Sequence, residues 1–247
     1  MRRLGVVFAT AAVALSSGCP ERHQSIDLTY LCDPSTSSRC GKENIRQGLA
    51  PFIRHPTVGS HARVITVGCG SDDADLLYEV FVPDHWGPGA NERKRMWSEA
   101  EWRHLSTLRL RRPQSCSGIV GAISRAARMS QQSGREQRRL LLDTDLREAS
   151  EETGFNFERS IPTAAEFVDA VKRRGLLPDL RGVELVVCDV HGDSSPNARR
   201  WSAKQSTALR AAWSAYFAEA GAGNVDFLER CPWQESVEGD TALSGGR

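Results

Sequence analysis

Apolar segments of two kinds alternate along the chain. Short runs rich in Val, Ile, Leu and Tyr end at Gly, Pro or Asp, which is typical of β-strands; they cover residues 25–32, 62–69, 76–82, 139–144, 183–190 and 224–228. Longer segments place apolar residues at helical spacing or carry helix start and stop signals; they cover residues 42–54, 91–108, 117–129, 163–175 and 199–220. The pattern therefore predicts six strands and five helices in largely alternating order.

This order predicts the fold class. Strands separated by helices form a mainly parallel sheet that helices cover on both faces. The connection between residues 69 and 76 is too short for a parallel crossover, which takes about a dozen residues, so residues 62–82 are expected to form a hairpin. We therefore expect an α/β fold: a three-layer sandwich around a doubly wound, mainly parallel sheet with one antiparallel edge strand. It would occupy residues 25–230 as one domain, before a flexible tail at residues 231–247.

The N-terminal segment predicts export. Arg2 and Arg3 are followed by an uncharged, mostly apolar run at residues 4–15, then by small residues, and then by Cys19. This order is typical of a secretory signal, and the run is shorter than the about 20 apolar residues that span a bilayer. We expect residues 1–18 to be removed as a signal peptide.

Cys19 directly follows Ser17 and Gly18, which indicates a bacterial lipoprotein signal in which this cysteine is acylated. Residues 19–24 would then be a short tether to a lipid anchor in the membrane. Ser16 stands where such signals favour an aliphatic residue, so ordinary secretion is the alternative. The expected location is the bacterial cell envelope, as a periplasmic or outer-surface lipoprotein.

Charge and cysteine content narrow the function classes. A formal net charge of +1 gives no overall field that would attract nucleic acid, and the local basic clusters lie among acidic residues. Besides Cys19 the chain has an even set of cysteines, which permits disulfides in an exported protein. A zinc site is disfavoured because no Cys-x-x-Cys pair occurs. The sequence does not choose among the possible disulfide pairings. The set is Cys32, Cys40, Cys69, Cys116, Cys188 and Cys231.

Oxygen-bearing side chains stand next to the ends of three predicted elements, at one edge of the sheet. In a parallel sheet, ligands bind beyond the carboxyl ends of the strands. Asp33, Ser35 and Ser37 form an Asp-x-Ser-x-Ser run after the first strand, Ser117 precedes a helix, and Asp145 follows the strand at residues 139–144. Hard oxygen ligands with little net charge suit Mg²⁺. The sequence therefore predicts a Mg²⁺ (or Mn²⁺) site at this edge.

These residues resemble the metal-ion-dependent adhesion site of the von Willebrand factor type A family. Asp33, Ser35 and Ser37 match its first motif, Ser117 stands where the family has Thr, and Asp145 matches its last Asp. Pro34 and Leu146 depart from the pattern, because small residues are common at the first place and Gly at the second. The resemblance to this family, abbreviated VWA, implies a Rossmann-like three-layer sandwich. Such a domain binds a protein partner whose carboxylate completes the coordination shell of the metal. It does not imply catalysis.

Two other interpretations remain open. Residues 140–145 (LLLDTD) resemble the start of a haloacid-dehalogenase-type Mg²⁺-dependent phosphatase, in which Asp143 would be the nucleophile and Asp145 the general acid/base. That family has the motif on its first strand, whereas here three strands precede it. The second interpretation is a domain that binds partners without a metal. Trp86, Trp97 and Trp102 would then be exposed contacts or a packed cover over the sheet edge. A serine hydrolase is disfavoured, because no Gly-x-Ser-x-Gly motif is present and His191 has no obvious nucleophile elbow to pair with.

Overall fold

The computed structural model describes residues 24–35, 37–38, 40–110, 114–135, 137–188 and 201–231. The strands are β1 (Ile26–Cys32), β2 (His61–Thr66), β3 (Asp75–Phe81), β4 (Gln137–Asp143), β5 (Ala149–Ser150), β6 (Phe155–Asn156), β7 (Val183–Cys188) and β8 (Val225–Leu228). The helices are α1 (Lys42–Arg54), α2 (Ala90–Thr107), α3 (Ile119–Gln132), α4 (Ala164–Arg173) and α5 (Ala203–Glu219).

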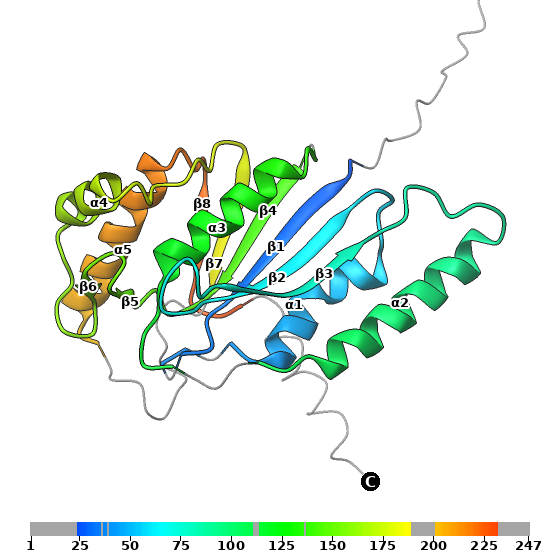
Figure 1. Cartoon of the computed structure of the whole chain (residues 1–247), viewed down its shortest axis with the longest axis horizontal. Coiled ribbons are helices and arrows are strands. Elements are labelled where there is room, and N and C mark those ends of the chain that lie inside the picture. The colour runs from blue at the N-terminus through cyan, green and yellow to red at the C-terminus, as the bar shows by residue number, and fades with distance from the viewer. Residues whose placement is uncertain are drawn as a thin grey trace, which may run out of the picture.

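One six-stranded sheet organises the molecule, in the order β3-β2-β1-β4-β7-β8 (Figure 1). All neighbouring strands run parallel except β2 and β3, which pair antiparallel at the edge. Counted along the chain, the order moves outward in one direction from β1 and then in the other from β4, as in doubly wound sheets. The predicted fold class is confirmed, including the antiparallel edge strand.

Helices cover both faces of the sheet. On one face, α3, α4 and α5 pack against the side chains of Leu31, Ile65 and Leu142, and Trp213 of α5 is fully buried among them. On the other face, α1 and α2 cover Tyr30 and neighbouring apolar residues of β2 and β3. Alternate residues of each strand thus enter different cores, so the strands are apolar along most of their length.

Local signals account for several element ends. Thr163 caps α4 in a capping box with Glu166, as the sequence predicts, and Ser202 caps α5 in the same way with Gln205. Trp86, Trp97 and Trp102 are buried or half-buried against the core between α1, α2 and the sheet edge, so they form the packed cover.

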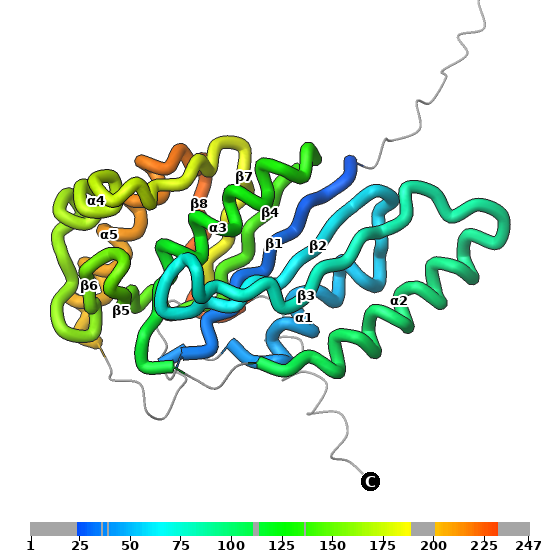
Figure 2. Tube along the Cα trace, viewed as in Figure 1, coloured from blue at the N-terminus to red at the C-terminus, as the bar shows by residue number. Residues whose placement is uncertain are grey.

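Two features differ from the prediction. The β5–β6 hairpin lies between β4 and α4 (Figure 2), where the sequence predicts no element, because strands of two residues show no periodicity. Cys231, assigned to the flexible tail, is fully buried and bonded to Cys188, so the packed domain extends through Cys231.

The predicted signal peptide, Cys19 and residues 232–247 lie outside the described residues. Within the described part of the chain, no helix has both the length and the apolarity that a membrane span needs.

Candidate metal site

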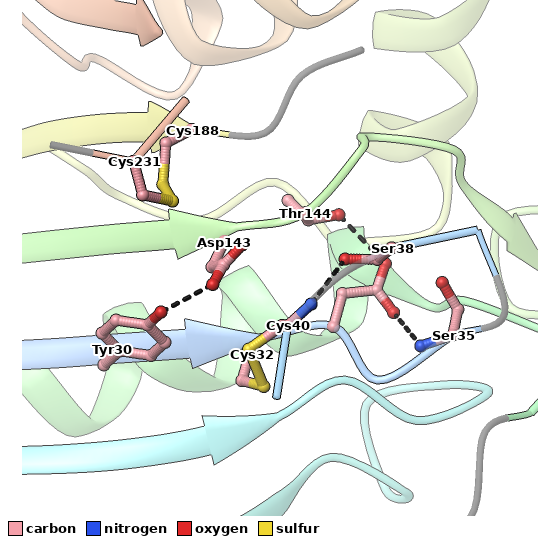
Figure 3. Close-up of a disulfide and its surroundings, with 10 residues drawn as sticks. Tyr30, Cys32, Ser35, Ser38, Cys40, Asp143, Thr144, Cys188 and Cys231 are labelled. Carbon is pink, nitrogen blue, oxygen red and sulfur yellow. Dashed lines mark hydrogen bonds between the residues drawn. A yellow bond between two sulfur atoms is a disulfide. The ribbon is translucent and has the colours of Figure 1, made fainter. Parts of the chain in front are cut away.

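Asp33 begins the site directly after β1. Its Oδ1 accepts a hydrogen bond from the backbone N–H of Ser35 at 3.0 Å, which tightens the loop into a local turn. The hydroxyls of Ser35 and Ser37 lie 3.4 Å apart. The Cys32–Cys40 disulfide closes the loop from both sides (Figure 3). The loop that carries three of the predicted ligands is therefore tied at its two ends.

Ser117 reaches Asp33 from the start of α3. Its hydroxyl donates to Oδ2 of Asp33 at 2.8 Å. The backbone of Ser117 exchanges two hydrogen bonds with Ala149, at 3.0 and 2.8 Å, and the N–H of Gly118 donates to the carbonyl of Gly68 at 2.7 Å. A Cβ on Gly118 would lie 2.8 Å from the backbone of Cys69, so only glycine fits this close approach.

The segment after β4 supplies the second carboxylate and a fourth hydroxyl. Thr144 Oγ1 donates to Oδ2 of Asp33 at 3.0 Å. Asp145 is fully buried, and its Oδ1 accepts from the backbone N–H of Arg147 at 3.0 Å. Its Oδ2 accepts no hydrogen bond within the described part of the chain, although Nε of Arg147 lies 3.3 Å away.

Burial and mutual repulsion shift the pKa values of both carboxylates. Burial raises the pKa of Asp145, and the negative charge of Asp33 raises it further, to about 7, while the Ser37 hydroxyl and Arg147 act in the opposite direction. Burial also raises the pKa of Asp33, against hydrogen bonds from Ser117, Ser35 and Thr144 that lower it. The structure thus brings the five predicted residues into one connected cluster in which two buried carboxylates repel each other.

This cluster fits a divalent cation. It offers two carboxylates and three hydroxyls, which are the oxygen donors that Mg²⁺ prefers. Oδ2 of Asp145 is a buried acceptor that accepts no hydrogen bond from the described residues, so a ligand can engage it once the Arg147 guanidinium, 3.3 Å away, moves aside. A cation there would also offset the repulsion between Asp33 and Asp145. The residues that would hold it are Asp33, Ser35, Ser37, Ser117 and Asp145.

Asp143 lies in a different environment from this cluster. Its Oδ2 accepts a 2.6 Å hydrogen bond from the Tyr30 hydroxyl on the α1-covered face of the sheet (Figure 3). Asp143, Cys188 and Cys231 lie within 4.8 Å of one another, but the two sulfurs are joined in a disulfide and are not metal ligands. A phosphatase would need Asp143 beside Asp145 at one open site, and Asp143 is instead fully buried against Tyr30.

All three disulfides lie at the edge that carries the cluster. Cys32 directly precedes Asp33, and Cys116, bonded to Cys69, directly precedes Ser117. Cys188, bonded to Cys231, accepts a backbone hydrogen bond from Thr144 at its carbonyl. The segments that carry Asp33 and Ser117 are therefore each next to a covalent link. The sequence indicated disulfides but not their pairing.

Comparisons with known proteins concern the fold. No protein-family model matches the chain, and no curated protein sequence is similar to it. Solved structures that match include a von Willebrand factor type A protein from Catenulispora acidiphila, at 14% identity and a TM-score of 0.43 over 89% of this chain and 42% of that one. An aerotolerance-related membrane protein from Bacteroides fragilis matches at 13% identity and a TM-score of 0.42, over 88% of this chain and 97% of that one.

The PilB minor pilin from Streptococcus sanguinis also matches, at 10% identity and a TM-score of 0.45, over 92% of this chain and 65% of that one. The chain resembles von Willebrand factor type A domains in fold. It spans less than half of the Catenulispora protein, and at these identities the likeness concerns the fold alone.

One departure from the von Willebrand factor type A pattern has a structural consequence. Leu146 follows Asp145 where that family commonly has Gly, and its φ is 60°, the left-handed region that favours glycine. It is the only non-glycine residue with positive φ in the described part of the chain. Its side chain is fully buried, and its carbonyl accepts a 2.9 Å hydrogen bond from Nε1 of Trp213. The backbone at Leu146 thus adopts a conformation that favours glycine, and packing holds the leucine in it.

Two residues of the cluster were missed from the sequence. Thr144 is adjacent to Asp145, but it falls within the strand predicted from the sequence, and its hydroxyl is not counted there as part of the site. Arg147 is not among the predicted site residues. Its ion pair with Asp145 depends on the turn at Leu146, which the sequence does not announce.

Proposed function

We propose that this chain is an exported VWA-like domain that binds a protein partner through a divalent cation, Mg²⁺ or Mn²⁺. Asp33, Ser35, Ser37, Ser117 and Asp145 hold the cation in this proposal. The partner supplies a carboxylate that completes the coordination shell.

The observation that carries the proposal is the burial of Asp33 and Asp145 beside each other. Placing two carboxylates in one dry site is unfavourable unless a cation or a proton compensates them. Serine and threonine hydroxyls surround the pair, so it is built from hydrogen-bonded oxygens rather than apolar contacts. Such a pair is difficult to explain as a purely structural feature, because an apolar pair would be less costly to bury.

The three disulfides support the exported location within the proposal. Disulfides persist in oxidising compartments such as the bacterial periplasm. The N-terminal signal and the acylated Cys19 would place the domain in the cell envelope, with the lipid as its membrane anchor. The geometry of Asp143 gives the phosphatase alternative no support, so the domain is proposed to bind and not to catalyse.

Mn²⁺ titration followed by water-proton relaxation tests the proposal. A site that awaits a carboxylate from a partner retains exchangeable water on the bound ion. We expect enhanced relaxation in the wild-type protein, its loss in Asp145→Asn, and its retention in the matched control Asp226→Asn, which changes an exposed aspartate of β8.

A generic phosphoester assay on the same samples separates the two functions. Binding without turnover supports the adhesion-type site. Turnover that is lost in Asp143→Asn would overturn the proposal in favour of the phosphatase. Relaxation that is equal in the wild type and Asp145→Asn would remove the proposed site.

A further inference from the structure

Arg147 is a buried cation at the edge of the candidate site. Its side chain is only 3% exposed. Nε lies 3.3 Å from Oδ2 of Asp145, and Nη1 donates to Oε1 of Glu158 at 3.0 Å. The guanidinium also lies over the ring of Trp201, 4.6 Å from its centroid. Three different side chains therefore fix the position of one charge.

This charge faces the same carboxylate oxygen that a metal ion would use. A guanidinium stays protonated at any pH that the protein meets. Two cations that share one carboxylate repel each other, and the repulsion is strong where water is excluded. Arg147 at its present distance and a divalent ion on Oδ2 of Asp145 therefore compete.

We infer that Arg147 is the resident counter-ion of Asp145, and that a divalent cation binds by displacing its guanidinium from that carboxylate. The inference rests on the proposed metal site and adds a residue that sets its affinity. Arg147 neutralises part of the buried charge in the metal-free protein, and metal binding requires the ion pair to open.

Glu158 and Trp201 make this displacement feasible. Glu158 is 39% exposed and lies on the solvent side of Arg147, so the guanidinium can shift toward it and remain paired. The Trp201 ring gives the cation a second favourable surface along which to move. Losing contact with Asp145 therefore does not leave a buried charge without compensation.

Two substitutions with opposite expected effects test the inference. Arg147→Gln removes the competing charge, and we expect Mg²⁺ to bind about fivefold tighter or more by calorimetry. Glu158→Gln removes the carboxylate toward which Arg147 would shift, and we expect weaker Mg²⁺ binding by several-fold. Arg139→Gln, which changes an exposed arginine paired with Glu184, is the matched control and should leave the affinity unchanged.

Tryptophan fluorescence gives a second readout, which would not respond to Mg²⁺ if Arg147 had only a structural role. If Mg²⁺ displaces the guanidinium, the emission of Trp201 should change with the same midpoint as the calorimetric titration. The change should vanish in Trp201→Phe, and it should also vanish in Arg147→Gln, where no charge moves. Circular dichroism confirms folding of each variant, and Glu158→Gln tests the inference independently if Arg147→Gln does not fold.

The outcomes separate the inference from the proposed function. Tighter binding in Arg147→Gln than in the wild type supports the inference. Wild-type binding with an unchanged or weaker affinity in Arg147→Gln overturns the inference and leaves the metal site standing. An absence of Mg²⁺ binding in the wild type overturns both.

Discussion

Ser117 and Asp33 lie 84 residues apart in the chain, and the hydroxyl of Ser117 donates a 2.8 Å hydrogen bond to the carboxylate of Asp33. The contact exists because β1 and the loop before α3 both end at the same edge of the sheet. Disulfides adjacent to both residues hold this geometry. The candidate ligands are therefore arranged before any ion binds, which reduces the ordering that binding requires.

Removing the Ser117 hydroxyl should weaken metal binding. Ser117→Ala deletes a donor to a buried carboxylate and a candidate ligand, and we expect Mg²⁺ affinity to fall about tenfold and the free energy of unfolding to fall by about 1–2 kcal/mol. Ser117→Thr keeps the oxygen and should bind Mg²⁺ as the wild type does. Calorimetry and urea unfolding measure the two effects. Equal affinities in the two variants would show that the hydroxyl is not a ligand.

Glu148 should make the metal-free protein less stable as the pH rises. Burial raises its pKa to about 7, although hydrogen bonds from Ser150, Val120 and Thr153 favour the charged form. Because the folded-state pKa lies above the unfolded value, this stabilising contribution is complete below about pH 4.5 and is lost as the pH rises through about 7.

Glu148→Gln should therefore flatten the pH profile of the melting temperature between about pH 5 and 8, measured in a chelator. Glu184→Gln changes an exposed carboxylate and is the matched control, which should keep the wild-type profile. A profile that stays equally steep in Glu148→Gln would assign the pH dependence to other groups.

Removing the Cys32–Cys40 disulfide should lower the affinity for Mg²⁺ in addition to lowering the free energy of unfolding. Replacing both cysteines by Ser frees the loop that carries Asp33, Ser35 and Ser37, so the ion must order it on binding. We expect a loss of about 2–3 kcal/mol in unfolding free energy and a clear fall in Mg²⁺ affinity. Replacing Cys188 and Cys231 is the control, because that bond closes no loop with a candidate ligand. Equal losses of affinity in the two double variants would contradict this prediction.

Replacing Leu146 with glycine should destabilise the protein, although the backbone conformation at this position favours glycine. Glycine would relieve a left-handed conformation that costs about 1 kcal/mol for a non-glycine residue, but it would also delete a fully buried leucine side chain, which costs about 2–5 kcal/mol. We therefore expect Leu146→Gly to be destabilised by about 1–4 kcal/mol in urea unfolding. A variant more stable than the wild type would show that backbone strain outweighs packing here.

Much of the fold could be predicted from the sequence because the apolar periodicity of the strands was strong. The short connection between β2 and β3 correctly predicted the antiparallel edge. The β5–β6 hairpin escaped prediction because its strands are too short to show a period. Cys231 was assigned to the tail because its role depends on a disulfide with Cys188, and spacing does not reveal such a pairing.

The candidate site was predictable only in part. Asp33, Ser35, Ser37, Ser117 and Asp145 follow element ends in sequence, so topology alone brings them together. Thr144 joins the site through the direction of its side chain directly after β4, and Arg147 follows the left-handed turn at Leu146. Glycine is the usual sequence signal for such a turn, and here the residue is a leucine.

Calorimetric titration of the purified protein with Mg²⁺, at about pH 8 where Asp145 is ionised, tests the central claim most directly. The wild type should bind one ion, and Asp33→Asn should lose that binding while circular dichroism shows an intact fold. Equal binding of Mg²⁺ by the wild type and Asp33→Asn, or no binding by the wild type, would contradict the proposed site.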